Sequence, residues 1–144
     1  MELIYPMFAL AMFTIIMVGV LGAARFIIVS SQQVHPRYLK TFDNEEHPPE
    51  YVVALARNYS NLLEMPILFY LAGLLSMTLN IVNETIILCA WAYVISRLFH
   101  TFVHVVYNNP LHRLMVFMVS TVILLVMWIV IIQHVMLQSR IFNF

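Results

Sequence analysis

The sequence predicts an all-α integral membrane protein, a bundle of four transmembrane helices formed by a single domain that spans residues 1–144. Of these residues, 62% are hydrophobic and only 10% are charged, whereas a typical soluble domain carries roughly 25% charged residues. Four apolar segments, at about residues 3–29, 51–79, 85–107 and 111–137, stand out along the chain. Each reaches the roughly 20 residues that a helix needs to cross the hydrocarbon core of a bilayer.

The first apolar segment, residues 3–29, is expected to remain in the protein as a transmembrane helix. It lacks the basic stretch of a signal peptide, its apolar run is too long for one, and three further spans follow it. The connection after it, residues 30–50, is the only long one. This connection ends in Pro48, Pro49 and Glu50, which suit the first turn of the second helix.

The later segments carry their own start and break signals. Pro66 lies inside the second segment and predicts a kink there, because proline cannot donate a backbone hydrogen bond. A short connection at residues 80–84 leads to the third segment. A tight connection at residues 107–111 precedes the fourth helix, with Asn109 as its expected N-cap and Pro110 as its first residue.

Charge and cysteine content exclude several classes of protein. The formal net charge is zero, so we expect no nucleic-acid partner. The single cysteine, Cys89, lies in an apolar run. It can build neither a disulfide framework nor a thiolate zinc site within one chain, and it is expected to be a small buried hydrophobic residue.

The distribution of Lys and Arg predicts the orientation in the membrane. Arg25, Arg37 and Lys40 flank or occupy the first connection, and Arg113 follows the third, whereas the second connection at residues 80–84 has no basic residue. Cytoplasmic loops are enriched in Lys and Arg. The first and third connections should therefore face the cytoplasm, with both termini outside, in a bacterial inner membrane or the endoplasmic reticulum.

The second helix carries a polar stripe in an otherwise apolar span. Arg57, Asn61 and Glu64 fall within roughly 60° of each other on a helix. A charged group near hydrocarbon costs roughly 2.5–3.5 kcal/mol on insertion scales. The three side chains should therefore face a protein interior or a wet cavity, and together they suit a zwitterionic ligand.

Other polar residues gather in the same, cytoplasmic half of the predicted bundle. The third helix carries Arg97, His100 and His104 in its later half, Arg113 lies in the first turn of the fourth helix, and Arg25 lies near the end of the first. Arg binds carboxylates through a planar fork and remains charged. These Arg residues therefore suit a ligand with carboxylates. On the second helix, Glu64 suits an ammonium group of the same ligand and Asn61 suits an amide.

Two alternatives use the same residues differently. Arg57 or Arg97 could pair with Glu64 in an internal ion-pair network that only fixes helix packing, although the excess of Arg would leave positive charge to be balanced. His100 and His104 are one turn apart, which is also metal-ligand spacing, with Glu64 as a third ligand. The neighbouring Arg residues disfavour a cation, so we predict no metal.

These residues resemble a known family, the membrane-associated proteins in eicosanoid and glutathione metabolism (MAPEG). Arg57, Asn61 and Glu64 match the Arg, Asn and Glu of the family pattern at identical spacing. The resemblance covers essentially the whole chain, as four helices with a long first cytoplasmic connection. The spacing is most similar to that of the microsomal prostaglandin E synthase and glutathione transferase branches of the family.

The resemblance extends to the other helices. Arg97 and His100, followed by His104, resemble the Arg, His and Tyr pattern of the third helix. Arg113 lies where the family places the Arg that stabilises the glutathione thiolate, and Arg25 fits the Arg at the end of the first helix. Four matches with consistent spacing, on a matching topology, make the resemblance fairly specific.

The resemblance implies a homotrimer that holds glutathione between neighbouring subunits near the cytosolic face. The three residues of the second helix would hold the γ-glutamyl end. Arg25 and Arg97 would hold the remaining anionic or carbonyl groups, and His100 and His104 would contact the same ligand. Arg113 would favour the thiolate, because a nearby cation lowers the pKa of a thiol. A lipophilic second substrate could enter from the bilayer lipid.

The chain also departs from the family pattern. His104 stands where the family usually has Tyr, Leu114 stands where the prostaglandin synthase has Ser, and Pro36 stands where that enzyme has a loop carboxylate. These departures argue against prostaglandin isomerase activity. The expected function is a membrane thiol transferase or peroxidase that acts on lipophilic electrophiles. The alternative is a non-catalytic membrane protein whose Arg cluster holds a lipid head group or a partner.

Overall fold

The computed structural model describes residues 2–37 and 48–142, and the side chains of the second range as far as residue 139. Lys40, one of the basic residues from which the orientation is predicted, lies outside the described residues. Within those residues the regular structure is α-helical and consists of α1 (Ile4–Ser30), α3 (Glu50–Glu64), α4 (Pro66–Thr78), α5 (Glu84–Val106) and α6 (Pro110–Phe142).

These helices form four stretches that are long and apolar enough to cross a membrane: Ile4–Ser30, Glu50–Thr78, Glu84–Val106 and Pro110–Ser139. The structure thus confirms the predicted all-α, four-span architecture. Many large apolar side chains point outward on all four spans, among them Phe8, Phe26 and Leu111. In a membrane protein such an exterior faces lipid or another subunit.

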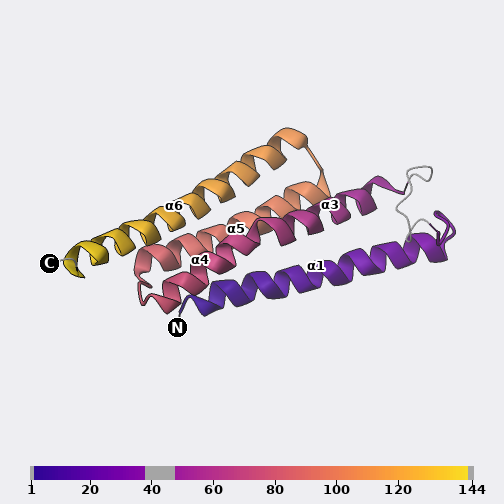
Figure 1. The fold of residues 1–144 in the computed structure, drawn as a ribbon. Helices are drawn as coiled ribbons and strands as arrows, with labels where there is room; N and C mark the ends of the chain where they lie inside the picture. Colours follow the sequence, from indigo (N-terminus) through magenta and orange to yellow (C-terminus); the bar gives the residue numbers. More distant parts are fainter. Residues whose placement is uncertain (1, 38–47, 143–144) are drawn as a thin grey trace.

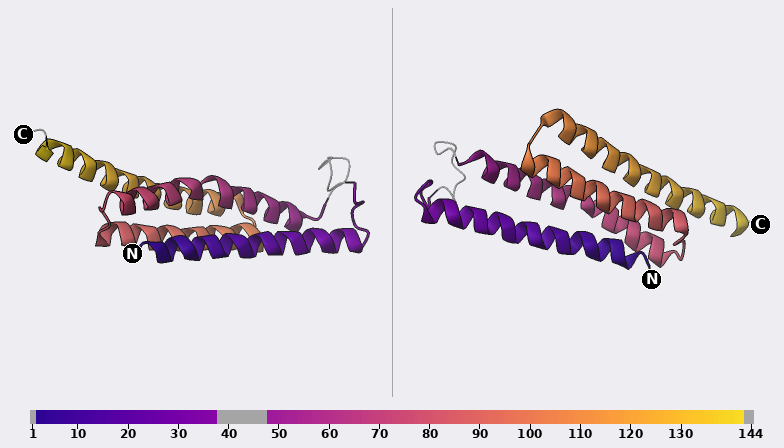
Figure 2. Two further views of the ribbon diagram at one scale, coloured as in Figure 1. Left: turned by 60° about the horizontal axis from the view of Figure 1, so that its bottom comes forward. Right: turned by 180° about the vertical axis from the view of Figure 1, so that it is seen from behind.

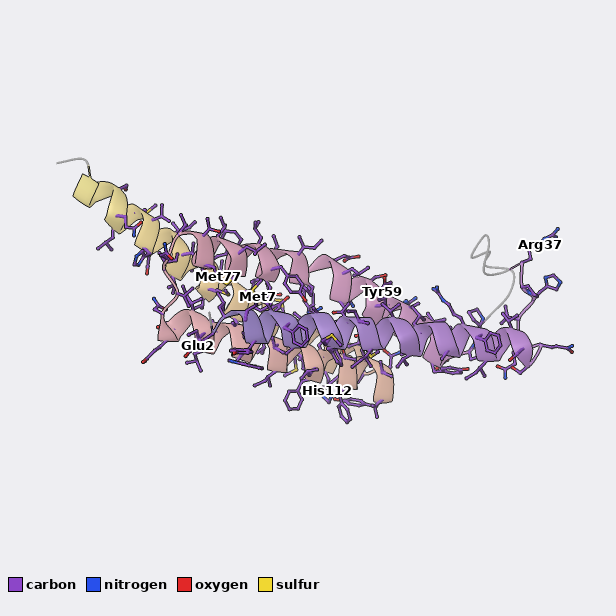
Figure 3. The ribbon with its side chains drawn as sticks, turned by 90° about the horizontal axis from the view of Figure 1, so that it is seen from below. Glu2, Met7, Arg37, Tyr59, Met77 and His112 are labelled. Atoms are coloured by element: carbon purple, nitrogen blue, oxygen red, sulfur yellow. The ribbon has the colours of Figure 1, made fainter. Side chains whose placement is uncertain are left out.

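The four spans run alternately up and down (Figure 1). Both chain termini lie at one end of the bundle, and the connections that follow α1 and α5 lie at the other (Figure 1). α1 packs on α3, and α5 packs on both α3 and α6. The C-terminal part of α6 projects beyond the other helices at the termini end in every view (Figure 2). Glu2 and Arg37 mark the two ends of the bundle (Figure 3).

The predicted kink at Pro66 is a break between two helices. α3 ends at Glu64 and α4 begins at Pro66, with Met65 between them at φ −71° and ψ −38°. Pro66 has no N–H group to donate to the carbonyl of Leu62, so the regular hydrogen-bond ladder cannot continue. Because Met65 keeps a helical conformation, α4 continues in nearly the same direction as α3 and the two still form one span.

The start of α3 differs slightly from the prediction. Pro48 and Pro49 precede the helix, which begins at Glu50, so their expected place in its first turn was wrong by one to two residues. Pro49 has an extended ψ of 142°, and its carbonyl accepts hydrogen bonds from the backbone N–H groups of Val52 and Val53 at 2.9 and 3.4 Å. It therefore acts as the N-cap residue, and Glu50 lies in the first turn as expected.

Asparagine side chains begin the last two spans. The Asn109 side-chain oxygen accepts hydrogen bonds from the N–H groups of Leu111 and His112 at 3.0 and 3.3 Å, and α6 starts at Pro110. This confirms the predicted cap. Asn83 caps α5 in the same way, accepting from the N–H of Ile86 at 2.9 Å. The sequence analysis missed this second cap.

The interior divides into two regions that we call the termini half and the loop half. The termini half contains an apolar cluster that joins α1, α4, α5 and α6, with buried side chains that include Leu10, Phe69, Ile86 and Met127. Met7 and Met77 pack at the edge of this cluster (Figure 3). Its core is thus largely hydrophobic and ties all four spans together.

The loop half is built differently. Its apolar cluster joins mainly α1 and α3, through side chains such as Leu21, Ile28 and Leu55. On the other side of α3, toward α5 and α6, polar side chains fill the interior. The buried polar residues of this region are Asn58, Arg97, His100, Thr101, His104 and Ser120.

Candidate functional site

The inner stripe of α5 positions the buried polar residues. Arg97, His100 and His104 follow each other at spacings of three and four residues, so they lie on one face of the helix. Arg97 and His104 are fully buried, and His100 is 2% exposed. The remaining faces of α5 carry exposed apolar residues such as Phe99 and Phe102. Packing of α5 against α3 and α6 therefore turns its polar stripe inward.

Arg97 is anchored at the proline break of the second span. Its Nη2 donates to the backbone carbonyl of Asn61 at 2.7 Å, and its Nη1 donates to the Ser120 hydroxyl at 3.4 Å. The guanidinium also lies 5.9 Å from the centre of the Phe117 ring. Asn61 belongs to the last turn of α3, where carbonyl groups lack helical partners and carry partial negative charge. A carbonyl of the last helical turn before the proline break thus supplies the acceptor that a buried cation needs.

A second polar contact lies one turn further along α5. The Thr101 hydroxyl donates to the side-chain oxygen of Asn58 at 3.1 Å, and both residues are buried. The sequence analysis assigned no role to Thr101, Asn58 or Ser120. The available signal was position: Thr101 falls between Arg97 and His104 on the same helical face, where an apolar residue would be expected in a purely hydrophobic core.

The two histidines form an adjoining pair. Their ring centroids are 5.7 Å apart with an interplanar angle of 62°, and the His100 ring lies 6.0 Å from that of Phe117. In the described part of the chain, no three His, Cys, Asp or Glu side chains come together as a possible metal site. The metal alternative thus lacks a third ligand among these residues.

The predicted stripe on the second span faces outward in the single chain. Arg57 and Glu64 are exposed, and Asn61 is half-buried. Between residues 57 and 64 the helix rises about 10.5 Å, too far for an ion pair. Arg97 uses its fork on Asn61 and Ser120 instead of Glu64. Within the described residues, the ion-pair alternative is therefore not formed, and Arg97 is balanced by carbonyl and hydroxyl oxygens.

Three of the predicted residues meet at an open cavity of about 360 Å³ near the loop end. Asn61 lines it from α3, His100 from α5 and Arg113 from α6. Pro110, Leu114 and Phe117 complete its wall. Arg113 is half-buried, and its Nη1 donates to the side-chain oxygen of Asn108 at 2.9 Å. The cavity thus combines a fixed cation, an imidazole and an apolar wall.

The remaining predicted residues lie outside this cavity. Arg57 lines a neighbouring cavity of about 300 Å³, together with Glu50 and Asn108. Arg25 is half-buried on α1, the helix that packs on α3. Glu64 lies at the C-terminal end of α3 and points outward. The single chain therefore brings Asn61, His100 and Arg113 together, buries Arg97 and His104, and presents Arg25, Arg57 and Glu64 at its surface.

The comparison with known families agrees with this arrangement. A model of the MAPEG family matches residues 3–133, nearly the whole chain. The chain therefore belongs to the MAPEG family, and it is an integral membrane protein. No curated protein and no solved structure matches it with significance.

Proposed function

We propose that this member of the MAPEG family binds glutathione, or a related thiol, at the loop end of the bundle and delivers the sulfur to a lipophilic electrophile. The observation that carries the proposal is the cavity lined by Asn61, His100 and Arg113. It places a fixed cation beside the apolar side chains of Leu114 and Phe117. A thiolate and an apolar substrate need these two environments side by side.

The proposed chemistry begins with ionisation of the thiol. Arg113 stabilises the thiolate, since a cation lowers the free energy of the charged form. In a transferase reaction the sulfur forms a bond to an electrophilic carbon, and the leaving group departs with the electron pair of the broken bond. In a peroxidase reaction the thiolate attacks the terminal oxygen of a lipid hydroperoxide and cleaves the O–O bond, which gives a sulfenic acid and, after protonation, the lipid alcohol. A second thiol then attacks the sulfenic sulfur, which forms the disulfide and releases water.

We propose that the outward-facing residues complete the site across a subunit interface. Glu64 is exposed near the middle of the second span, where contact with hydrocarbon would cost roughly 2.5–3.5 kcal/mol on insertion scales for comparable charges. A neighbouring subunit that covers Arg57, Asn61 and Glu64 removes that cost. In the proposed homotrimer these residues hold the γ-glutamyl end, Arg25 and His100 contact the remaining groups of the ligand, and Arg97 and His104 lie buried behind them.

The orientation is part of the same proposal. Arg25, Arg37 and Arg113 all belong to the loop end, and the excess of basic residues favours the cytoplasm there. Soluble thiol would then reach the cavity from the cytosol, while the apolar substrate arrives from the lipid. The membrane is a bacterial inner membrane or the endoplasmic reticulum.

The alternative proposal keeps the fold without the chemistry. The exposed Arg57 and the half-buried Arg25 and Arg113 could hold the phosphate of a lipid head group or the acidic surface of a partner. That protein would bind no thiol. The exposed positions of Arg57 and Glu64 in the single chain favour this reading as much as they favour a thiol between subunits, so a binding measurement must decide.

The deciding experiment is calorimetric titration of the purified, detergent-solubilised oligomer with reduced glutathione. We expect saturable binding by the wild type and a large loss of affinity in Glu64→Gln. Glu84→Gln, which neutralises an exposed carboxylate at the opposite end of the bundle, should bind as tightly as the wild type. Native mass spectrometry of each sample reports the oligomeric state. Absence of binding by a folded, oligomeric wild type would favour the lipid or partner alternative.

A further inference from the structure

Several buried polar atoms of the loop half, and of its border with the termini half, make no hydrogen bond of good geometry to the described protein atoms. They are Asn58 Nδ2, the Tyr93 hydroxyl, Arg97 Nε and both ring nitrogens of His100 and of His104. Four of the five residues follow each other on α5 at spacings of four, three and four residues, so they form one continuous stripe. We call these five residues the polar seam.

A neighbouring subunit cannot satisfy these atoms. Asn58, Tyr93, Arg97 and His104 are fully buried within the single chain, and His100 is 2% exposed. A second chain, a lipid or a glutathione molecule that covers the outer surface would not reach them. Since buried polar groups in proteins are nearly always paired with protein or with ordered water, the partner must be small enough to enter between α3, α5 and α6.

The chemistry of the seam selects water over a small anion. Asn58 Nδ2 and Arg97 Nε are donors, but a neutral imidazole offers one donor and one acceptor, and a tyrosine hydroxyl does both. An anion accepts hydrogen bonds only and would leave the acceptors unpaired. Water donates and accepts, so a connected set of waters can satisfy every atom of the seam.

The seam has an entrance. His100 lines the open cavity of about 360 Å³ and lies between His104 on one side and Arg97 on the other along α5. We propose that a file of internal waters runs from this cavity along the polar seam and ends at the Tyr93 hydroxyl, in the middle of the membrane-spanning bundle. The proposal concerns water alone and does not depend on whether the cavity binds a thiol.

At the inner end of the file, Phe69 is a buried neighbour of Tyr93 that offers water no polar group. The Tyr93 ring stacks on the Phe69 ring with centroids 4.8 Å apart and an interplanar angle of 22°. Both residues are fully buried and both belong to the apolar cluster of the termini half, so the Tyr93 hydroxyl lies where the polar seam meets that cluster. The file should therefore stop between two neighbouring aromatic rings, of which only one carries a polar group.

Hydroxyl-radical labelling of the intact oligomer in lipid nanodiscs, with radicals produced from water by a brief X-ray pulse, tests the proposal. Short-lived radicals formed from bound water oxidise the side chains beside it. We expect oxidation of Tyr93, His100 and His104 to exceed that of Phe69 several-fold. After rapid mixing with ¹⁸O-water, these residues should incorporate the heavy isotope more slowly than exposed Tyr107 does. Labelling of Tyr93 and both histidines at the Phe69 level would overturn the proposal.

A variant tests the continuity of the file. His100→Leu places an apolar side chain between the cavity and Tyr93 and should lower the labelling of Tyr93 at least twofold. The matched variant His112→Leu changes an exposed histidine of α6, which contacts Tyr107, and should leave the labelling of Tyr93 unchanged. Equal labelling of Tyr93 in both folded variants would contradict a file that enters beside His100. If His100→Leu does not fold, the labelling of the wild type decides the proposal by itself.

Discussion

The helices of the termini half pack through apolar side chains, whereas those of the loop half also pack through buried polar side chains. In the termini half, apolar side chains such as Leu10, Phe69 and Met127 join all four spans. Its one fully buried serine, Ser76, donates to the carbonyl of Ala72 in its own helix at 2.8 Å. In the loop half, the contacts between α3, α5 and α6 are polar and cross from helix to helix.

The difference between the apolar core of one half and the polar interior of the other separates the part that stabilises the fold from the part that can bind a ligand. An apolar core needs no particular partner for any atom and fails only when volume is lost. A polar interior fixes the relative positions of named groups, such as Arg97 and the Asn61 carbonyl, and leaves other groups open to water or ligand. The termini half therefore holds the bundle together, and the loop half has the side chains that can do chemistry.

The largest effect should follow from removing volume in the termini half. Phe69→Ala should destabilise the folded protein by about 3–5 kcal/mol, because a fully buried aromatic ring leaves a cavity behind. Unfolding monitored by circular dichroism in mixed micelles with increasing denaturing detergent measures this. Phe102→Ala, at an exposed position of α5, serves as the control. Equal losses in the two variants would mean that the apolar cluster is not the main source of stability.

A comparable effect is expected on turnover in the loop half. Arg113→Ala should lower kcat roughly 10²–10³-fold, in line with the loss of one group that stabilises developing charge, while most of the glutathione affinity remains. Steady-state conjugation of an apolar aryl halide and calorimetry measure the two quantities, and Arg113→Lys, which keeps the cation, should retain part of the rate. Equal loss of binding and turnover would argue against a role in thiolate stabilisation.

A smaller effect should follow from breaking one polar contact. Thr101→Val keeps the shape of the side chain but removes the donor to the Asn58 oxygen, which should cost about 1–3 kcal/mol because a buried acceptor loses its partner. The same unfolding measurement reports it, with Thr85→Val at an exposed position of α5 as the control. A neutral result at Thr101 would indicate that water replaces the lost hydroxyl.

The smallest effect concerns a helix end in the termini half. Asn83→Ala should cost about 1 kcal/mol, within the range of roughly 0.5–2 kcal/mol for loss of an N-cap, since the Ile86 N–H loses its acceptor. Asn83→Asp or Asn83→Ser should restore most of the stability. If all three variants are equally destabilised, the side chain matters for a reason other than capping.

Local signals in the sequence were enough for most of the fold. The four spans, the break at Pro66 and the cap at Asn109 follow from hydropathy, from the missing N–H of proline and from the hydrogen-bonding capacity of asparagine. Each depends on neighbours within one or two turns. The gathering of polar residues at one end also follows, because alternating helices bring the start of one span beside the end of the next.

The candidate site could be predicted from the sequence only in part. The residues Asn61, His100 and Arg113 were expected to be near one another, and they line one cavity. The role of Arg97 as an anchor for the last turn of α3 was not foreseen, because its partner is a backbone carbonyl. A sequence specifies side chains, and it does not reveal which backbone carbonyl a side chain will reach until a second helix lies beside it.

What the sequence by itself determined is the number of spans, the break in the second span and the end of the bundle at which polar groups collect. What only the tertiary structure decided is which of those groups turn inward. Arg57 and Asn58 are adjacent in the chain, yet Arg57 is exposed and Asn58 is fully buried. Successive residues of a helix point about 100° apart, so the side that meets α5 decides between them, and packing alone sets that side.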